Sequence, residues 1–358
     1  MTHCIHRRNF LAGISGVAAA GPLNFALADE KPTITLVEWG GRTRESIAAL
    51  QKYQSVANLR WELHAGGAAA IVAKIRAAKP AVNYDVVAAW SPVFVTMINE
   101  DWLETVTPEE MPNLADIPAG LFIRDASGAA KTVPREINPH MWGYRQDRAP
   151  FEIRRLQDLL DKRLKGQIVF PGPVLNTSTQ MISIARGLGG SEENMKPAWE
   201  FVKELAKSGN IGRVASSDAE VNNSLTSGET SVGFGAASHF MRIADAGLPV
   251  TPLAKMPADS GFKAAIAMQG WCILKGGNTK VAKAWANAMV APEPNSQHAA
   301  HNGVLPVNAK SSVPPRIAAI RYSNDELAAH TYTPNWEVVS RELPNWTQRW
   351  EREIAPLL

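Results

Sequence analysis

Cysteine is almost absent from this sequence. Only Cys4 and Cys272 occur among the 358 residues, and Cys4 lies in an N-terminal segment that we expect to be removed. A single remaining cysteine excludes an internal disulfide and a cysteine-based metal cluster. A strong charge of one sign is missing too, because 37 Lys and Arg stand against 34 Asp and Glu. Since no basic run occurs either, we expect no nucleic-acid partner.

Motifs of common enzymes are also missing. The sequence has no Gly-x-Ser-x-Gly, no phosphate-loop signature and no Gly-x-Gly-x-x-Gly after a predicted strand. His298 and His301 stand three residues apart and could share a helix face, but no third ligand follows at the spacing of a metal motif. We therefore expect no catalytic residue, no metal and no cofactor.

The N-terminus has the pattern of an export signal. Arg7 and Arg8 precede an apolar run, residues 11–27, that contains no charged side chain. The run ends in Ala26-Leu27-Ala28, a small-x-small cleavage pattern. The arginine pair favours a twin-arginine signal peptide over residues 1–28, with a Sec signal as the alternative.

The mature chain should begin near Asp29 and be soluble in the periplasm. It keeps about 330 residues, which is too long for one ordinary core and predicts two domains. Because 45% of the residues are hydrophobic, the chain has enough apolar surface to fold.

Strand-like and helix-like runs alternate along this chain. Segments rich in apolar and β-branched residues at 33–37, 59–63 and 84–89 are separated by helix-like segments at 43–53 and at 66–78, the latter opened by Gly66-Gly67. Such alternation is typical of a parallel α/β sheet, whose ligands bind at the carboxyl ends of the strands.

Several short motifs follow one another in a fixed order. They are Trp39-Gly40-Gly41; Asn83-Tyr84-Asp85-Val86-Val87; Met111-Pro112-Asn113-Leu114; Val133-Pro134 followed by Gly143-Tyr144; Asp158-Leu159-Leu160; Leu164-Lys165-Gly166; and Asn335-Trp336 with Trp346 and Trp350. In this order they resemble the bacterial extracellular solute-binding proteins of the spermidine/putrescine, iron(III) and thiamine cluster. The resemblance covers essentially the whole mature chain.

The resemblance implies an α/β, two-lobed periplasmic-binding-protein fold of type II. Each lobe would be a doubly wound mixed sheet, joined to the other by a two-segment hinge. With crossings near Pro134–Tyr144 and Pro249–Pro252, lobe 1 should comprise residues 29–138 and 252–315, lobe 2 residues 139–251, and C-terminal helices residues 316–358. The implied protein is a monomer without catalysis, which closes over a small solute and delivers it to an ABC permease in the inner membrane.

In the first lobe, Trp39-Gly40 and Trp90-Ser91 each follow a predicted strand, so we expect them at the ligand edge. Tryptophan rings stack on apolar groups or lie over cations, although packing at the rim would explain them equally well. Arg42 and Arg44 open the next helix and could bind an acidic group, or form a solvated surface pair. Tyr144 lies beside the crossing, where hinge packing is the alternative to ligand contact.

In the second lobe, residues Asn176, Thr177, Ser178 and Thr179 stand between a strand and a helix. Their hydroxyls and free N–H groups could cap the helix, bind an anionic or polar group, or do both. Gly235 and Ser238 follow the strand that ends at Phe234, so we expect them at the rim of this lobe.

The charge of these loops bears on the solute. Loops after Phe170 and Phe234 carry no acid, and a buried ammonium without a carboxylate is unfavourable. Glu38 is the acid that could still serve a polyamine. All five tyrosines are isolated, whereas iron(III) members of the cluster use a consecutive pair. We expect an anionic or zwitterionic solute; the alternatives are a polyamine or thiamine, or a periplasmic enzyme on a similar scaffold.

Overall fold

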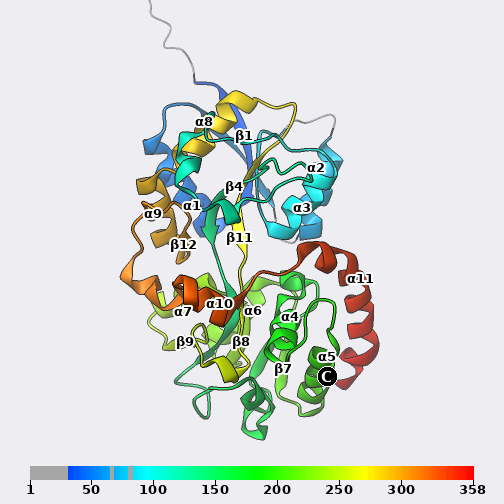
Figure 1. Cartoon of the computed structure of the whole chain (residues 1–358). Coiled ribbons are helices and arrows are strands. Elements are labelled where there is room, and N and C mark those ends of the chain that lie inside the picture. Colours follow the sequence, from blue (N-terminus) through cyan, green and yellow to red (C-terminus); the bar gives the residue numbers. More distant parts are fainter. Residues whose placement is uncertain (1–30, 65–67, 80–83) are drawn as a thin grey trace, which may run out of the picture. The chain divides into compact units, whose positions relative to one another are not determined.

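The computed structural model describes residues 31–64, 68–79 and 84–358. The expected signal peptide, its cleavage site and Asn83 lie outside the described residues. Everything below concerns Pro32–Leu358, which forms one unit. Two mixed sheets with helices on both faces make up this unit (Figure 1), as the sequence predicts.

The first sheet combines parallel and antiparallel pairing, with β1, β2, β3 and β4 running one way and β11 and β12 the other. β1 pairs in parallel with β2 and β3, whereas β11 runs antiparallel to β3 and β4. All five residues of β3 are buried, as a central strand covered on both faces requires. The strand order is β12 (Leu305–Pro306), β4 (Val133–Ile137), β11 (Met268–Ile273), β3 (Val86–Trp90), β1 (Thr33–Trp39), β2 (Asn58–His64).

The second sheet is also mixed. β6 pairs in parallel with β7 and β8, and β5 runs antiparallel to β8, β9 and β10. The strand order is β13 (Thr331–Tyr332), β10 (Ala264–Ala265), β5 (His140–Arg145), β8 (Val232–Ala236), β6 (Ile168–Pro171), β7 (Ile211–Ala215), with β9 (Val250–Pro252) paired to β5 beside this path.

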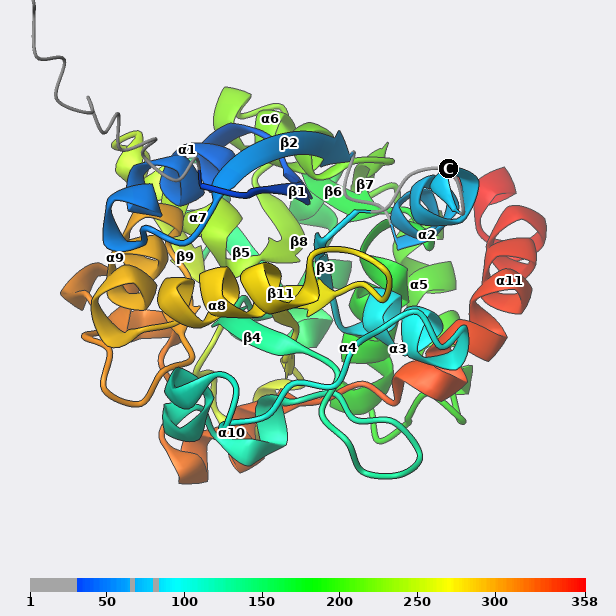
Figure 2. The same ribbon diagram turned by 90° about the horizontal axis from the view of Figure 1, so that it is seen from above.

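Helices cover both faces of each sheet (Figure 2). On the first sheet, α1 and α8 pack on one face and α2 and α3 on the other; on the second sheet, α4 and α5 pack opposite α6 and α7. The α-helices are α1 (Gly41–Ala49), α2 (Ala68–Ala78), α3 (Ser91–Asn99), α4 (Thr179–Gly187), α5 (Lys196–Lys207), α6 (Asp218–Ser227), α7 (Ala237–Asp245), α8 (Thr279–Met289), α9 (Pro292–Asn302), α10 (Asn324–His330) and α11 (Trp336–Glu353).

Apolar periodicity explains why these segments are helical. In α5, for example, the buried side chains recur at helical spacing and leave the charged residues outside; they are Ala198, Trp199, Phe201, Val202, Leu205 and Ala206. Within the described part of the chain, no helix has both the length and the apolar character needed to span a membrane.

The chain passes between the sheets later than the sequence suggests. The first crossing, between β4 and β5, lies within the expected segment. The return was expected near Pro249–Pro252, but Val250–Pro252 form β9 of the second sheet, and the chain crosses at Ile266–Ala267. Pro252 is compatible with β9 because an edge strand tolerates a proline. The second lobe therefore continues to β10, and β13 from the C-terminal segment joins it.

Candidate functional site

Strand ends from both sheets approach each other around Trp90 and His140. Trp90 ends β3 in the first sheet, and His140 begins β5 in the second, where it pairs with Ala236 at the end of β8. The two rings lie 5.8 Å apart between centroids. We call this meeting of strand ends the inter-lobe site.

The first lobe supplies aromatic side chains to the inter-lobe site. Trp39, half-buried at the end of β1, meets His64 of β2 edge-on at 4.8 Å. Trp90 is buried between His140 and Trp336, whose ring is 5.6 Å away. Gly40 precedes α1 as its N-cap. The sequence thus predicted correctly that these residues end strands, while Trp90 is more enclosed than an open stacking platform would be.

The hydroxyl of Ser91 is already used within the first lobe. It donates to the carbonyl of Met268 at 3.3 Å and so joins the start of α3 to the start of β11. A solute would therefore have to compete with this bond.

Glu38 belongs to a buried ionic network rather than to an open ligand surface. Its carboxylate accepts from Arg135 at 2.9 Å and from the Trp271 indole at 3.0 Å, and it is fully buried. Arg135 also pairs with Glu136 at 3.2 Å, and Glu136 bonds His298 at 2.5 Å. Since Arg135 neutralises it, Glu38 is not available to a polyamine.

Burial and pairing act in opposite directions on this network. Burial raises the pKa of Glu38, and Arg135 offsets the rise only in part. Burial also opposes ionisation of Glu136, but there Arg135 and His298 prevail and lower its pKa to about 2. The network ties the hinge-side strand β4 to β1 and α9, beneath Trp39.

The second lobe contributes a strained loop before α4. Asn176, Thr177 and Ser178 have φ angles of 55°, 53° and 60°, the left-handed region that residues other than glycine rarely adopt. All three are buried. Such strain persists only where the surrounding structure enforces it, and it is concentrated at functional sites.

Some polar groups of this loop are already satisfied. The Ser178 hydroxyl donates to the Pro173 carbonyl at 2.8 Å, and the Thr179 hydroxyl lies 3.2 Å from Nδ1 of His140. The Nδ2 atom of Asn176 is buried and forms no hydrogen bond of good geometry in the described part of the chain, but the side chain interacts with Asp218. Asn176 and Thr177 are therefore better placed to bind a solute than the two residues that follow them.

Gly235 and Ser238 serve the local structure. A Cβ atom on Gly235 would lie 3.1 Å from Nδ1 of His239, so glycine makes room for that imidazole. Ser238 exchanges two hydrogen bonds with Asn138 in the first crossing, at 3.0 and 3.2 Å. This pair fastens the start of α7 to the hinge.

Sequence reasoning missed a titratable cluster at the same edge: His140, Asp218, His239 and Arg242. Asp218 opens α6 after β7, and its carboxylate lies 3.9 Å from Nε2 of His239. Because only the loops after β6 and β8 were considered, the acid after β7 was overlooked. The sequence did contain a signal for this acid. Ser217-Asp218 is a helix-start pattern, with Ser217 as the N-cap, directly after a strand.

Burial controls the protonation of this cluster. It lowers the pKa of His140 to about 4, against the opposing effect of Asp218, and it holds the pKa of His239 well below its ordinary value. The Asp218 side chain is 52% exposed, so the desolvation that raises its pKa is limited, and His140, Arg242 and Asn176 oppose the rise. Both imidazoles are neutral at pH 7, so each has a nitrogen that can accept a hydrogen bond.

Three predicted residues are engaged with other side chains or backbone groups of the protein. Arg44 is exposed, with its guanidinium 5.4 Å from the centre of the Trp61 ring. Tyr144 is buried four residues further along β5 than His140, opposite Val232 at the start of β8. The Arg42 guanidinium bonds the His301 carbonyl and pairs with Asp245. Because each side chain already has protein neighbours, we leave all three out of the proposed solute contacts.

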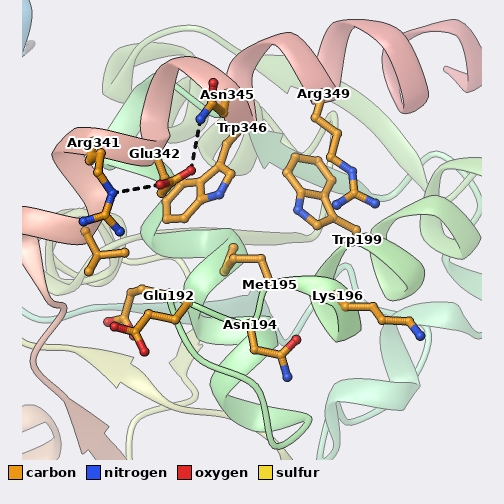
Figure 3. Close-up of a pocket in the computed structure, with 12 residues that line it drawn as sticks. Glu192, Asn194, Met195, Lys196, Trp199, Arg341, Glu342, Asn345, Trp346 and Arg349 are labelled. Atoms are coloured by element: carbon orange, nitrogen blue, oxygen red, sulfur yellow. Dashed lines mark hydrogen bonds and ion pairs between the residues drawn. The ribbon is translucent and has the colours of Figure 1, made fainter.

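Two cavities lie elsewhere. One, of about 510 Å³, separates α5 from α11 (Figure 3); there Glu342 accepts from Arg341 and Asn345, and Arg349 extends over Trp199 at 4.7 Å. The other, of about 650 Å³, is lined by Ile137 at the end of β4 and by Ile266 in the return crossing. Neither includes Trp39, Trp90 or the loop before α4.

Two sheets that meet at their strand ends, joined by crossing segments, form the two-lobed fold found in periplasmic binding proteins. The sequence agrees: residues 48–326 match the model of a family described as bacterial extracellular solute-binding protein. The chain belongs to this family. Membership confirms the prediction of a solute-binding protein and removes the alternative of an enzyme.

Solved structures show the same fold at low sequence identity. A putative extracellular solute-binding protein from Bordetella parapertussis is 19% identical, with a TM-score of 0.69 over 92% of this chain and 100% of that one. A putative spermidine/putrescine ABC transporter protein from Listeria monocytogenes is 16% identical, with a TM-score of 0.70 over 90% and 99%.

A third structure carries a sugar phosphate. The periplasmic binding protein AfuA from Actinobacillus pleuropneumoniae, bound to fructose-6-phosphate, is 19% identical, with a TM-score of 0.69 over 90% of this chain and 98% of that one. No curated protein matches the sequence.

Proposed function

We propose that this protein is the monomeric, periplasmic solute-binding component of an ABC importer. Its solute would be a small polar molecule with an anionic or zwitterionic group, held at the inter-lobe site. The proposal is supported by family membership and by structural neighbours described as ABC transporter proteins. The observation that carries the charge assignment is the loop Asn176–Ser178 before α4.

This loop suits a group that accepts hydrogen bonds. It precedes a helix N-terminus, whose first N–H groups have no partners within the helix and whose dipole favours negative charge. The buried Asn176 side chain adds a donor that faces Asp218, so the amide and the carboxylate together could hold the oppositely charged ends of a zwitterion. A hydrogen bond to a charged group contributes about 1.5–3 kcal/mol, enough to favour an anion over a neutral analogue by tenfold or more.

Asp218 favours a zwitterion over a dianion. Its carboxylate lies at the same edge of the second sheet and could pair with an ammonium group. A linear polyamine has at least two ammonium groups to neutralise, and Glu38 is already paired with Arg135. Leaving one buried charge unpaired costs several kcal/mol, so polyamines are the weaker candidates.

Transport would follow from closure of the lobes. Contacts to Trp39 from one lobe and to Asn176 and Thr177 from the other would stabilise the closed form only when a solute bridges them. The solute shifts the equilibrium by its differential affinity for the two forms. The permease would then recognise the closed form.

Titration calorimetry on the mature protein tests the solute class. We expect an amino acid, sugar phosphate or small carboxylate to bind, and Thr177→Val to weaken that binding about tenfold through the lost hydroxyl contact. Thr347→Val, on α11, is the matched control and should bind as the wild type does. Micromolar binding of putrescine or spermidine, without any binding of anionic solutes, would contradict the proposal.

Export is tested separately by mass spectrometry of the periplasmic protein. We expect its first residue to lie at or near Asp29, since Ala26-Leu27-Ala28 precedes it. Replacing Arg7 and Arg8 by lysine should abolish twin-arginine export. Unchanged export would indicate a Sec signal, and an intact N-terminus on soluble periplasmic protein would contradict cleavage.

A further inference from the structure

Asp245 occupies an unusual place for an acidic residue. It is the last residue of α7, where the helix dipole disfavours negative charge. Its position therefore costs helix stability unless cations surround the carboxylate. Two arginines from different parts of the chain do so.

Arg42 and Arg316 both hold the Asp245 carboxylate. The Nη1 atom of Arg316 lies 2.8 and 3.0 Å from its two oxygens, and Nη1 of Arg42 lies 3.5 Å from Oδ2. Arg42 is in α1, directly after β1 of the first sheet. Arg316 is in the 3-10 helix Pro315–Ile320, whose Ile317 packs in the core of the second lobe.

Both arginines also bind the end of α9. The Nη2 atom of Arg42 donates to the His301 carbonyl, and Nη2 of Arg316 donates to the Ala300 carbonyl. These carbonyls lie in the last turn of α9, where cations are stabilised. Since α9 leads into β12 of the first sheet, the Arg316 bond crosses between lobes, as does the Arg42–Asp245 pair.

The backbones of the two lobes also lie close together here. Gly303 ends α9 with φ of 72°, and a Cβ atom on it would lie 2.8 Å from Cβ of Met241 in α7. Glycine therefore permits an approach that a side chain would block.

We propose that Arg42, Asp245 and Arg316 form a latch that holds the lobes closed even without solute. The latch fastens α7 of the second lobe to α1 and α9 of the first. It goes beyond the proposed function and does not depend on which solute binds. Its role is to set the population of the closed form, and through it the affinity for any solute.

The exposure of the latch makes it sensitive to salt. Between 34% and 38% of each of the three side chains remains exposed. Partly exposed pairs are modest in strength and are screened by salt, with a Debye length of about 10 Å at 0.1 M and about 3 Å at 1 M. A weak latch suits a reversible closure, because solute must still enter and leave.

Distance measurements between spin labels test the latch on the unliganded mature protein. Labels go on Lys203→Cys in α5 and Lys280→Cys in α8, both exposed; Cys272 is buried and does not interfere. We expect Asp245→Asn to lower the ratio of the short to the long distance about fivefold. Arg42→Gln, which removes one arm from the first lobe, should give a smaller shift in the same direction.

The matched control is Glu229→Gln. It breaks the Arg213–Glu229 pair, which has similar exposure but joins two elements of the second lobe. Its distance distribution should equal that of the wild type, while 1 M NaCl should move the wild type toward the Asp245→Asn distribution. Identical distributions for wild type, Asp245→Asn and Arg42→Gln, or an equal shift in Glu229→Gln, would overturn the latch.

Discussion

Buried imidazoles at the inter-lobe site are held neutral by their surroundings. His140 at the start of β5 and His239 in the first turn of α7 have little contact with water, and burial lowers the pKa of both. In the unfolded chain the same groups titrate near pH 6.5. The folded protein therefore binds fewer protons than the unfolded chain in weakly acidic solution.

This difference predicts that the protein loses stability on acidification. His140 has a folded pKa of about 4, below its unfolded value, so its contribution is complete above pH 6.5 and is lost as the pH falls toward 4. The loss amounts to about 3 kcal/mol of unfolding free energy for this residue. Urea unfolding at several pH values between 7.5 and 4.5 measures it.

His140→Gln isolates the contribution of one imidazole. The variant should show a shallower fall of unfolding free energy with decreasing pH than the wild type, whatever its stability at pH 7.5. Parallel curves for the two proteins would show that His140 already titrates normally in the folded state.

Helices and strands of this protein are held in place by a few very close approaches. At the end of α4, a Cβ atom on Gly187 would lie 1.8 Å from the carbonyl oxygen of Gly261, in the loop before β10. On the other side of α5, α11 packs through Trp350, whose ring stacks on Phe170 of β6 at 5.5 Å. These approaches fix the helices over the sheet whose strand ends form the site.

Gly187→Ala should lower the unfolding free energy by about 1–3 kcal/mol, because backbone must move to admit the methyl group. Helix propensity alone predicts the opposite sign, a gain of about 1 kcal/mol. Gly120→Ala is the control, since nothing lies within 4 Å of its added Cβ. Urea unfolding compares both with the wild type, and a stabilised Gly187→Ala would refute the close approach.

Most elements could be predicted from the sequence, and the exceptions have physical causes. Alternating apolar runs located β1, β2 and β3, and the apolar stripe located α5. Pattern does not reveal which sheet a short strand joins, so β9 was taken for a crossing. The left-handed backbone of Asn176–Ser178 could not be predicted, because these residues include no glycine. Tertiary contacts, which the sequence does not reveal, enforce this conformation.

The site itself was only half predictable for a similar reason. A residue that ends a strand can be recognised locally, as Trp39 and Trp90 were. The partner of a side chain cannot be recognised in this way. The sequence alone suggested Arg42 as a ligand contact, whereas the structure pairs it with Asp245, which is distant in the chain. The same holds for Ser238, whose hydroxyl is occupied by Asn138.

On the scale of the whole molecule, the lobes are connected in more than the two places expected. The chain crosses between the lobes at residues 138–139 and 266–267. It crosses a third time after β12, on its way to the second-lobe strand β13. Added connections restrict the relative motion of the lobes. Closure should therefore resemble bending along one direction, with the latch of Arg42, Asp245 and Arg316 fixing its end point.

The late arrival of β11 decides when this protein can finish folding. Its residues pair with residues that are synthesised much earlier: Cys272 pairs with Val87, and Trp271 pairs with Val133. About three-quarters of the chain must leave the ribosome before Met268 appears, whereas β5, β6, β7 and β8 are contiguous in the chain and can assemble earlier. Sheets built from such distant segments fold slowly and expose apolar edges meanwhile. A nascent chain threaded outward during synthesis would carry its first lobe unfinished across the membrane, while a translocase for folded cargo receives it complete.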